Sequence, residues 1–177
     1  MKKILSLVFL LCCTFFSSTA FSQSVSPKTE FLMSVEFKID PLVSIDQGLL
    51  IGNIPSGTIS GPNIKGTVHS PSADWLQILP SGVAKTDVRV LIKTDDGEAI
   101  YVSYNGILKH SEKSYAKFIK GEEITPDDGI YLVSAPIFRT SSKKYDYLNG
   151  IQAIYKMTRL RLGTDGGYVR LEIFAVE

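Results

Sequence analysis

Residues 61–106 read GPNIKGTVHSPSADWLQILPSGVAKTDVRVLIKTDDGEAIYVSYNG, and the predicted sheet is built around them. Three strand-like runs lie in it, at 74–79, 83–93 and 99–104. They are separated by the loops Pro80-Ser81-Gly82 and Asp95-Asp96-Gly97. Loops of this length that end in glycine join antiparallel strands through a type I turn followed by a residue with positive φ. The stretch therefore predicts two consecutive β-hairpins.

The two loops also predict which residues share a face of the sheet, because side chains alternate between the two faces along each strand. Thr94 is expected opposite Glu98, and Leu79 opposite Val83. Counting away from the loops gives one nearly apolar face: Asp74, Leu76, Ile78, Val88, Val90, Ile92, Ile100, Val102 and Tyr104. We expect this face to be the interior of the domain, with Asp74 as its only charged residue.

A carboxylate on an interior face is the main candidate for catalysis. Burial disfavours the ionised form, so we expect a raised pKa for Asp74 unless hydrogen bonds keep the group ionised. In the functional interpretation, Asp74 orients a ligand or acts as a general acid or base. In the alternative, it lies at the mouth of the domain, in water or bonded to loop amides near Ser70–Ala73. The sequence leaves both open.

Five aromatic or basic residues are candidate ligand contacts. Trp75, Arg89 and Tyr101 fall on the opposite face, where they would form a clamp for an anion or an aromatic ligand. The alternative for these three is an outer cation–π contact without a ligand. Tyr104 lies on the interior face, and Tyr131 lies in a later strand-like run with its hydroxyl expected at the rim.

The rest of the chain predicts more strands and a single helix. Further strands are expected at 30–39, 58–60, 64–69, 130–140, 151–162 and 168–176. Pro136 should interrupt its run or place it at a sheet edge. A helix is expected over Ser111–Lys120, capped by Ser111 and ended by Gly121, with His110 exposed to solvent before it. Many short strands with one short helix predict an all-β fold, a single antiparallel β-barrel, with a sandwich as the alternative.

The N-terminus predicts a cleaved secretory signal peptide at 1–22. Two lysines precede an apolar run at 4–16, which is shorter than the roughly 20 residues that span a bilayer. Small residues predict cleavage after Ser22, which leaves one domain at 23–177. The mature protein is then expected in the periplasm or the medium, without attachment to a membrane.

Composition limits the classes of site and partner. Both cysteines, Cys12 and Cys13, lie in the predicted signal peptide, so the mature domain would have no disulfide and no thiol nucleophile. Two histidines and no mature cysteine predict no metal site, and no nucleotide-binding or dinucleotide-binding motif predicts a cofactor. Cleavage would leave 17 basic and 18 acidic residues, a balance that does not indicate a nucleic-acid partner.

Several short motifs in a fixed order carry a family resemblance. They are Gly61-Pro62, Gly66, Ala73-Asp74-Trp75, Gly82-Val83, Asp87-x-Arg89, Thr94-x-Asp96-Gly97, Ile100-Tyr101-Val102, Pro136 with Phe138, and Tyr145 with Leu148-Asn149. In these the chain resembles the bacterial proteins grouped as domain of unknown function 3237, over about 30–176. The resemblance implies a small β-barrel of lipocalin-like or cyclase-like shape and no established activity.

The chain departs from that family's pattern at two places. Pro71-Ser72 stands where the family usually has a glycine pair, and Val133 stands where it often has arginine. If that arginine binds a ligand anion in other members, this chain has lost the contact.

Three functions are compatible with these patterns. The first is an exported barrel that binds a small, partly apolar molecule oriented by Asp74 and nearby tyrosines. The second is a cofactor-independent cyclase, isomerase or lyase that uses Asp74 as acid or base. The third is an adaptor with Trp75, Arg89 and Tyr101 as a contact patch. The first two predict a cavity that reaches Asp74, whereas the third predicts a filled interior.

Overall fold

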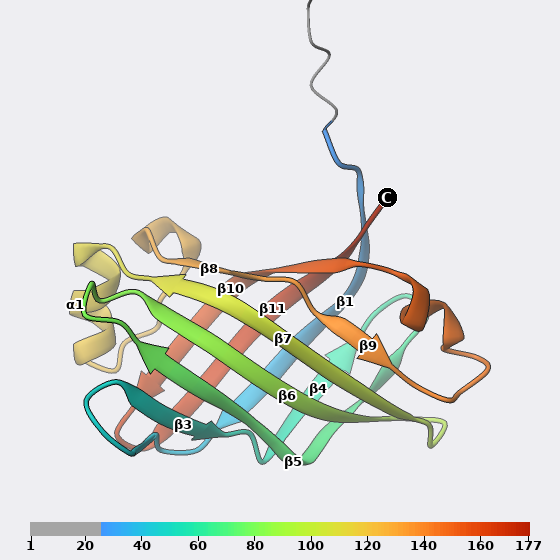
Figure 1. Ribbon diagram of the computed structural model, residues 1–177, viewed down its shortest axis with the longest axis horizontal. Helices are drawn as coiled ribbons and strands as arrows, with labels where there is room; N and C mark the ends of the chain where they lie inside the picture. The colour runs from blue at the N-terminus through green and yellow to red at the C-terminus, as the bar shows by residue number, and fades with distance from the viewer. Residues whose placement is uncertain (1–25) are drawn as a thin grey trace, which may run out of the picture.

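The computed structural model describes residues 26–177 (Figure 1). The predicted signal peptide lies outside the described residues. Within 26–177, no helix combines the length and the apolar character that crossing a membrane would require.

The described residues form strands with one α-helix and two short 3₁₀ helices. The strands are β1 (Thr29–Ile39), β2 (Val43–Ser44), β3 (Leu49–Asn53), β4 (Ser56–Ser60), β5 (Lys65–Ile78), β6 (Ala84–Thr94), β7 (Ala99–Lys109), β8 (Tyr131–Ser134), β9 (Ile137–Arg139), β10 (Ala153–Gly163) and β11 (Gly166–Val176). The helices are α1 (Glu112–Ile119), η1 (Pro126–Asp128) and η2 (Asp146–Gly150).

Eight of the strands close into a barrel. Neighbouring strands pair antiparallel in the order β5-β4-β1-β11-β10-β8-β7-β6, and β6 pairs with β5 to complete the circle. Strand β3 extends from the second half of β5, β2 pairs with β3, and β9 pairs with β7. The all-β barrel with one helix is therefore confirmed over the sandwich.

Both predicted hairpins are present, in the predicted register. Gly82 has φ 78° and Gly97 has φ 91°, the positive values that the two loops require. The Leu79 N–H donates to the Val83 carbonyl at 2.8 Å, and the Thr94 N–H donates to the Glu98 carbonyl at 2.9 Å. One row across three strands then reads Asp74 on β5, Val88 on β6 and Tyr104 on β7.

The structure corrects the prediction of separate strands at 64–69 and 74–79, because both belong to β5. A register shift between His69 and Ala73 lets the strand bend and continue. Ser72 is buried there, donates from its hydroxyl to the His69 carbonyl at 2.6 Å and accepts from the Leu91 N–H at 2.9 Å. The hydroxyl thus takes the place of missing ladder hydrogen bonds. The first half of β5 pairs with β4 and the second half with β3.

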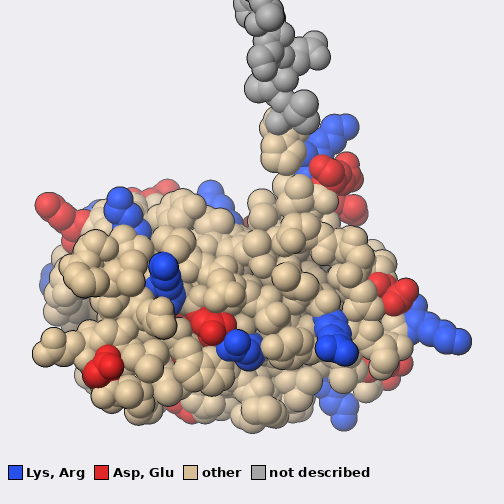
Figure 2. All heavy atoms as spheres, viewed as in Figure 1, with Lys and Arg blue, Asp and Glu red and all other residues tan. Residues whose placement is uncertain are grey.

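The two ends of the barrel differ. At one end, where β9 and η2 lie in Figure 1, buried side chains fill the interior: Met33, Val90, Ile92, Ile100, Phe138, Tyr145 and Leu148. Helix α1 lies at the opposite end. On the face shown in Figure 2, charged side chains are scattered and neither sign gathers into a patch. The part of the interior that can hold a site is therefore the end near α1.

Candidate functional site

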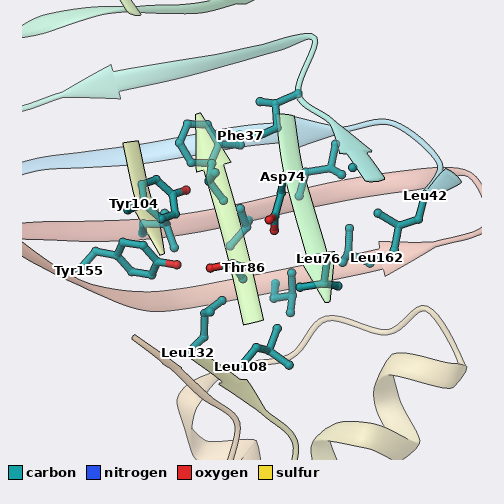
Figure 3. Close-up of a pocket in the computed structure, with 17 residues that line it drawn as sticks. Phe37, Leu42, Asp74, Leu76, Thr86, Tyr104, Leu108, Leu132, Tyr155 and Leu162 are labelled. Carbon is teal, nitrogen blue, oxygen red and sulfur yellow. The ribbon is translucent and has the colours of Figure 1, made fainter. Parts of the chain in front are cut away.

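A cavity of about 70 Å³ lies inside the barrel, and Asp74 projects into it (Figure 3). Its wall is built mainly from aliphatic side chains of β1, β5, β6, β10 and β11. Four lining side chains carry polar atoms: Asp74, Thr86, Tyr104 and Tyr155. Asp74 therefore points inward, as the register predicted, and lies in a wall that is otherwise apolar.

The surroundings of Asp74 favour its neutral form. Its Oδ1 accepts a hydrogen bond from the Asp87 backbone N–H at 3.1 Å, a strand amide and not one of the loop amides near Ser70–Ala73. Burial raises the pKa of Asp74 to about 7, the Asp87 N–H opposes the rise, and the negative charge of Asp87 adds to it. Both the protonated and the ionised carboxyl are thus populated near neutral pH.

Two tyrosines face the same cavity. Tyr104 is two strands away from Asp74 in one row, and its ring meets the ring of Tyr155 edge to face, with centroids 5.1 Å apart and an interplanar angle of 80°. Burial raises the pKa of both phenols, and the charge of Asp74 contributes to each rise. Both therefore remain neutral hydrogen-bond donors at physiological pH.

Tyr155 is a residue of the cavity that the sequence patterns did not single out. It lies on β10 between Ala153 and Met157, and all three are buried. This alternation with period two marks an inward-facing row and was a usable signal. What the alternation does not reveal is that β10 lies across the barrel from Asp74.

A third hydroxyl, that of Thr86, is made available by a glycine. Thr86 is paired with Gly106 on β7, which is paired with Ser134 on β8. A Cβ on Gly106 would lie 2.8 Å from Thr86 Oγ1 and 2.9 Å from Ser134 Cβ, so only glycine leaves this space open. Within 26–177, the buried Thr86 Oγ1 has no hydrogen bond of full geometry, although it lies close enough to the Tyr155 hydroxyl to oppose the rise in the pKa of that phenol. Since buried polar atoms are usually paired, this hydroxyl is a candidate ligand contact.

The other predicted ligand contacts lie away from the cavity. Trp75, Arg89 and Tyr101 are on the outer face, where the Arg89 guanidinium lies 5.4 Å from the centroid of the Trp75 ring. Arg89 also forms an ion pair of 3.0 Å with Asp87. Tyr131 is 54% exposed on β8. Of the predicted site residues, only Asp74 and Tyr104 line the cavity, whereas Trp75 and Arg89 meet each other on the outer face. The ligand-binding roles of the residues outside the cavity stay predictions.

A second, larger hollow of about 540 Å³ lies at the α1 end of the barrel. Its wall includes His110, Tyr115 and Phe118. The expectation that His110 is exposed to solvent is wrong: the residue is half-buried, since its ring packs 5.3 Å from Phe118 and 6.0 Å from Tyr115. Burial lowers the pKa of His110, so the ring is neutral near pH 7.

This chain is similar in sequence to one protein family and to two related proteins. A model of the family described as protein of unknown function (DUF3237) matches residues 27–176. A UPF0311 protein of Clostridium acetobutylicum is 31% identical over 124 residues, which cover 67% of this chain and 78% of that protein. The hydroalkoxylation enzyme phnH of Penicillium herquei is 27% identical over 150 residues, which cover 82% of this chain and 85% of that protein.

Solved structures share the fold. A conserved protein of unknown function from Rhodopseudomonas palustris superposes with a TM-score of 0.76 at 23% identity, covering 87% of this chain and all of that one (100%). An enzyme from Penicillium herquei superposes with a TM-score of 0.62 at 26% identity, covering 88% of this chain and 98% of that one. The first similarity concerns the fold alone, and the second adds that a similar barrel serves as an enzyme.

Proposed function

We propose that this chain, which belongs to the DUF3237 family of proteins of unknown function, is a cofactor-independent enzyme. It binds a small, partly apolar molecule and transfers a proton with Asp74. The observation that carries the proposal is a carboxyl group with a pKa of about 7 in the wall of an apolar cavity. A general acid or base works best when its pKa lies near the operating pH, and such catalysis contributes about 10²–10⁴-fold in rate.

The tyrosines and the threonine complete the acid–base interpretation. Tyr104 and Tyr155 stay protonated because burial raises their pKa, so each can donate a hydrogen bond to an oxygen on which negative charge develops. The Thr86 hydroxyl, beside that of Tyr155, can orient a polar group of the substrate within the described cavity. These groups supply proton transfer and orientation without an added electrophile.

The relative from Penicillium herquei supports a reaction class. Hydroalkoxylation adds an alcohol across a carbon–carbon double bond: the O–H bond and the π bond break, and a C–O bond and a C–H bond form. The net reaction therefore moves one proton from oxygen to carbon. The relative aligns over 82% of this chain, and a carboxyl group that is half ionised near pH 7 suits either half of that proton transfer. We therefore propose an addition or cyclisation of this kind, with lyase or isomerase chemistry at the same carboxyl as the nearest alternatives.

A second candidate function is binding without chemistry. Ligand pockets are mostly apolar with a few placed polar groups, and the composition of this cavity fits that description. An adaptor role finds less support, because the interior near Asp74 is hollow and not filled. We further propose that the protein acts outside the cytoplasm, after removal of residues 1–22, without a nucleic-acid partner.

The test is turnover of simple phenols that carry an alkene, such as 2-allylphenol, by the protein purified from its host. We expect formation of the cyclic ether, followed by mass spectrometry in D₂O, which labels the newly protonated carbon. Asp74→Asn should slow the reaction at least about 10²-fold. The matched control is Trp75→Phe, since Trp75 is adjacent in sequence but lies on the outer face.

Equal rates for Asp74→Asn and the wild type would rule out proton transfer by Asp74. Native mass spectrometry of the same samples separates the two candidates. A phenol that is retained by the wild type, lost from Asp74→Asn and never converted would favour binding without chemistry.

A further inference from the structure

The small cavity around Asp74 and the larger hollow near α1 adjoin each other. Five leucines line both: Leu42, Leu76, Leu108, Leu160 and Leu162. We call these five side chains the leucine collar. In Figure 3, Leu42 and Leu162 lie on one side of Asp74, and Tyr104 and Tyr155 lie on the other. A ligand that enters past α1 therefore meets the collar before it reaches the carboxyl group.

The inner cavity and the outer hollow differ in volume, so they would hold different parts of a ligand. The inner cavity, at about 70 Å³, is smaller than the roughly 150 Å³ in which an engineered cavity holds benzene. The outer hollow, at about 540 Å³, lies within the roughly 300–1,000 Å³ that is usual for ligand pockets. Only a narrow group of a few non-hydrogen atoms fits beside Asp74, and the body of the ligand has to stay outside the collar.

The wall of the outer hollow suits a flat ring system. The Tyr115 and Phe118 rings are stacked with an interplanar angle of 24° and centroids 6.4 Å apart, and His110 packs against both. Leu50, Ile78 and the leucine collar supply further apolar surface. Aromatic rings pack favourably against one another in offset-stacked and edge-to-face arrangements. Lys109 and Glu112, one charge of each sign, also line the hollow, but apolar side chains make up most of its wall. This composition favours an apolar ring over a charged ligand.

The aromatic wall is held in place before a ligand arrives. Asp128 forms ion pairs of 2.7 Å with Lys113 and with Lys117, both on α1. The Ser111 hydroxyl, at the start of the helix, donates to the Asp128 carbonyl at 2.6 Å. Because α1 is tied to η1 in this way, a ligand would lose little affinity to the cost of ordering the wall.

We propose that the outer hollow is a second binding compartment, which holds the flat apolar ring system of a ligand whose short arm passes the leucine collar to Asp74. The proposal rests on the use of the inner cavity in the proposed function, but it does not need proton transfer. In this proposal, residues of α1 determine which ring systems bind. The leucine collar and the wall of the inner cavity determine which arms fit.

The experiment compares two fluorescent probes, 2-naphthol and 6-isopropyl-2-naphthol, by fluorescence anisotropy with the protein purified from its host. The second probe adds a three-carbon arm, and we expect it to bind about tenfold more tightly, since the arm buries apolar surface in the inner cavity. Leu132→Trp fills that cavity from β8 without lining the outer hollow. It should reduce the advantage of the arm to less than about twofold while leaving 2-naphthol binding unchanged.

Variants of the aromatic wall test the outer compartment. Tyr115→Ala and His110→Ala should each weaken binding of both probes about tenfold. Ile119→Ala is the matched control, because Ile119 is on the same helix, is 66% exposed and does not line the hollow. If Leu132→Trp does not fold, nuclear Overhauser contacts in the wild type replace it, from naphthol ring protons to Tyr115 and from the isopropyl group to Leu132.

Three results would overturn the proposal: no binding of either probe at millimolar concentration, equal affinity of the two probes for the wild type, or unchanged affinity in the wall variants. Asp74→Asn separates this proposal from the proposed function. If Asp74→Asn turns over alkenyl phenols like the wild type but the probes behave as expected, proton transfer by Asp74 fails and the two-compartment site stands.

Discussion

Asp74 lowers the stability of the folded protein when its carboxyl group is ionised. The difference between the ordinary pKa of 3.8 and the value of about 7 in the barrel corresponds to about 4 kcal/mol of penalty on the ionised form. Above pH 7 that penalty is carried in full by the folded protein. A residue kept at such a cost in a wall of aliphatic side chains is more consistent with a role in chemistry than with a role in stability.

Asp74→Asn should therefore stabilise the barrel at high pH. The carboxyl ionises in the unfolded chain above about pH 4 but stays protonated in the folded chain up to about pH 7, so wild-type stability falls across that window and then levels off. The variant keeps an acceptor for the Asp87 N–H and lacks this loss. Urea unfolding from pH 4 to 8 should show a gap that opens to at most about 4 kcal/mol. A gap that does not change with pH would contradict the raised pKa.

Gly106→Ala should destabilise the protein by about 1–3 kcal/mol, because the added methyl group would press on Thr86 and Ser134 in the wall of the cavity. Gly150→Ala is the control, since a Cβ there meets nothing within 4 Å, and we expect a change within about 0.5 kcal/mol. Denaturant unfolding measures both. Equal stabilities would mean that the cavity wall yields more easily than the backbone positions indicate.

Two segments at opposite ends of the barrel are held in place by hydrogen bonds and ion pairs to an aspartate. Helix α1 is held at the open end by Asp128. The tip of the β6–β7 hairpin is held at the filled end by Asp96, which accepts from the Lys144 ammonium at 2.6 Å and from the Tyr145 hydroxyl at 3.1 Å. The hydrogen bonds to Asp96 join residues 48 and 49 positions apart in the chain, whereas those to Asp128 span 11 to 17 positions. Both sets of bonds hold a loop through residues outside that loop.

The cap of α1 should contribute measurably to stability and to the outer compartment. The Ser111 hydroxyl accepts from the Ser114 N–H at 3.1 Å and donates to the Asp128 carbonyl. Ser111→Ala should cost about 1–2 kcal/mol in urea unfolding and weaken 2-naphthol binding. Ser141→Ala, at an exposed loop position, should change neither quantity. An intact affinity with a lowered stability would separate the cap from the ligand site.

Asp96, at the tip of the β6–β7 hairpin, should make stability depend on pH in the opposite direction to Asp74. Hydrogen bonds from Lys144, Thr94 and Tyr145 hold the pKa of Asp96 well below its usual range. Its contribution to stability is present above about pH 4 and is lost as the pH falls through acid values. Asp96→Asn should lower the thermal midpoint at pH 7 and reduce the further loss at pH 2–3, whereas Asp95→Asn should do neither. Identical acid profiles for all three proteins would contradict this role.

The interior of the barrel is packed with side chains at one end and hollow at the other. Side chains such as Met33, Ile100 and Leu148 fill one end completely, which provides the buried apolar surface that a domain of this size needs. The other end is freed for Asp74 and the two hollows. A fold with one packed end can tolerate an incompletely filled site at the other, and this division makes the proposed function compatible with a stable domain.

The predicted export gives a test on the whole chain. The intact mass of protein recovered from the periplasm or the medium should correspond to residues 23–177, with Gln23 as the new N-terminus. N-terminal sequencing provides an independent check. Recovery of the uncleaved chain from the cytoplasm would overturn both the predicted cleavage and the proposed location.

Sequence patterns alone are enough to predict the all-β class, helix α1, both central hairpins and the inward-facing row that holds Asp74. These features depend on hydrogen bonds between residues a few positions apart, so loop length and alternation are sufficient to predict them. Tyr104 followed from the same register, because it lies in the row of Asp74.

Only the folded structure shows that β10 brings Tyr155 into the cavity with Asp74, and that aromatic side chains of α1 pack against His110. It also decided the two volumes on which the proposed ligand depends. The physical reason is that barrel closure joins strands distant in the chain, and the space left inside depends on all the interior side chains at once, which no local pattern records.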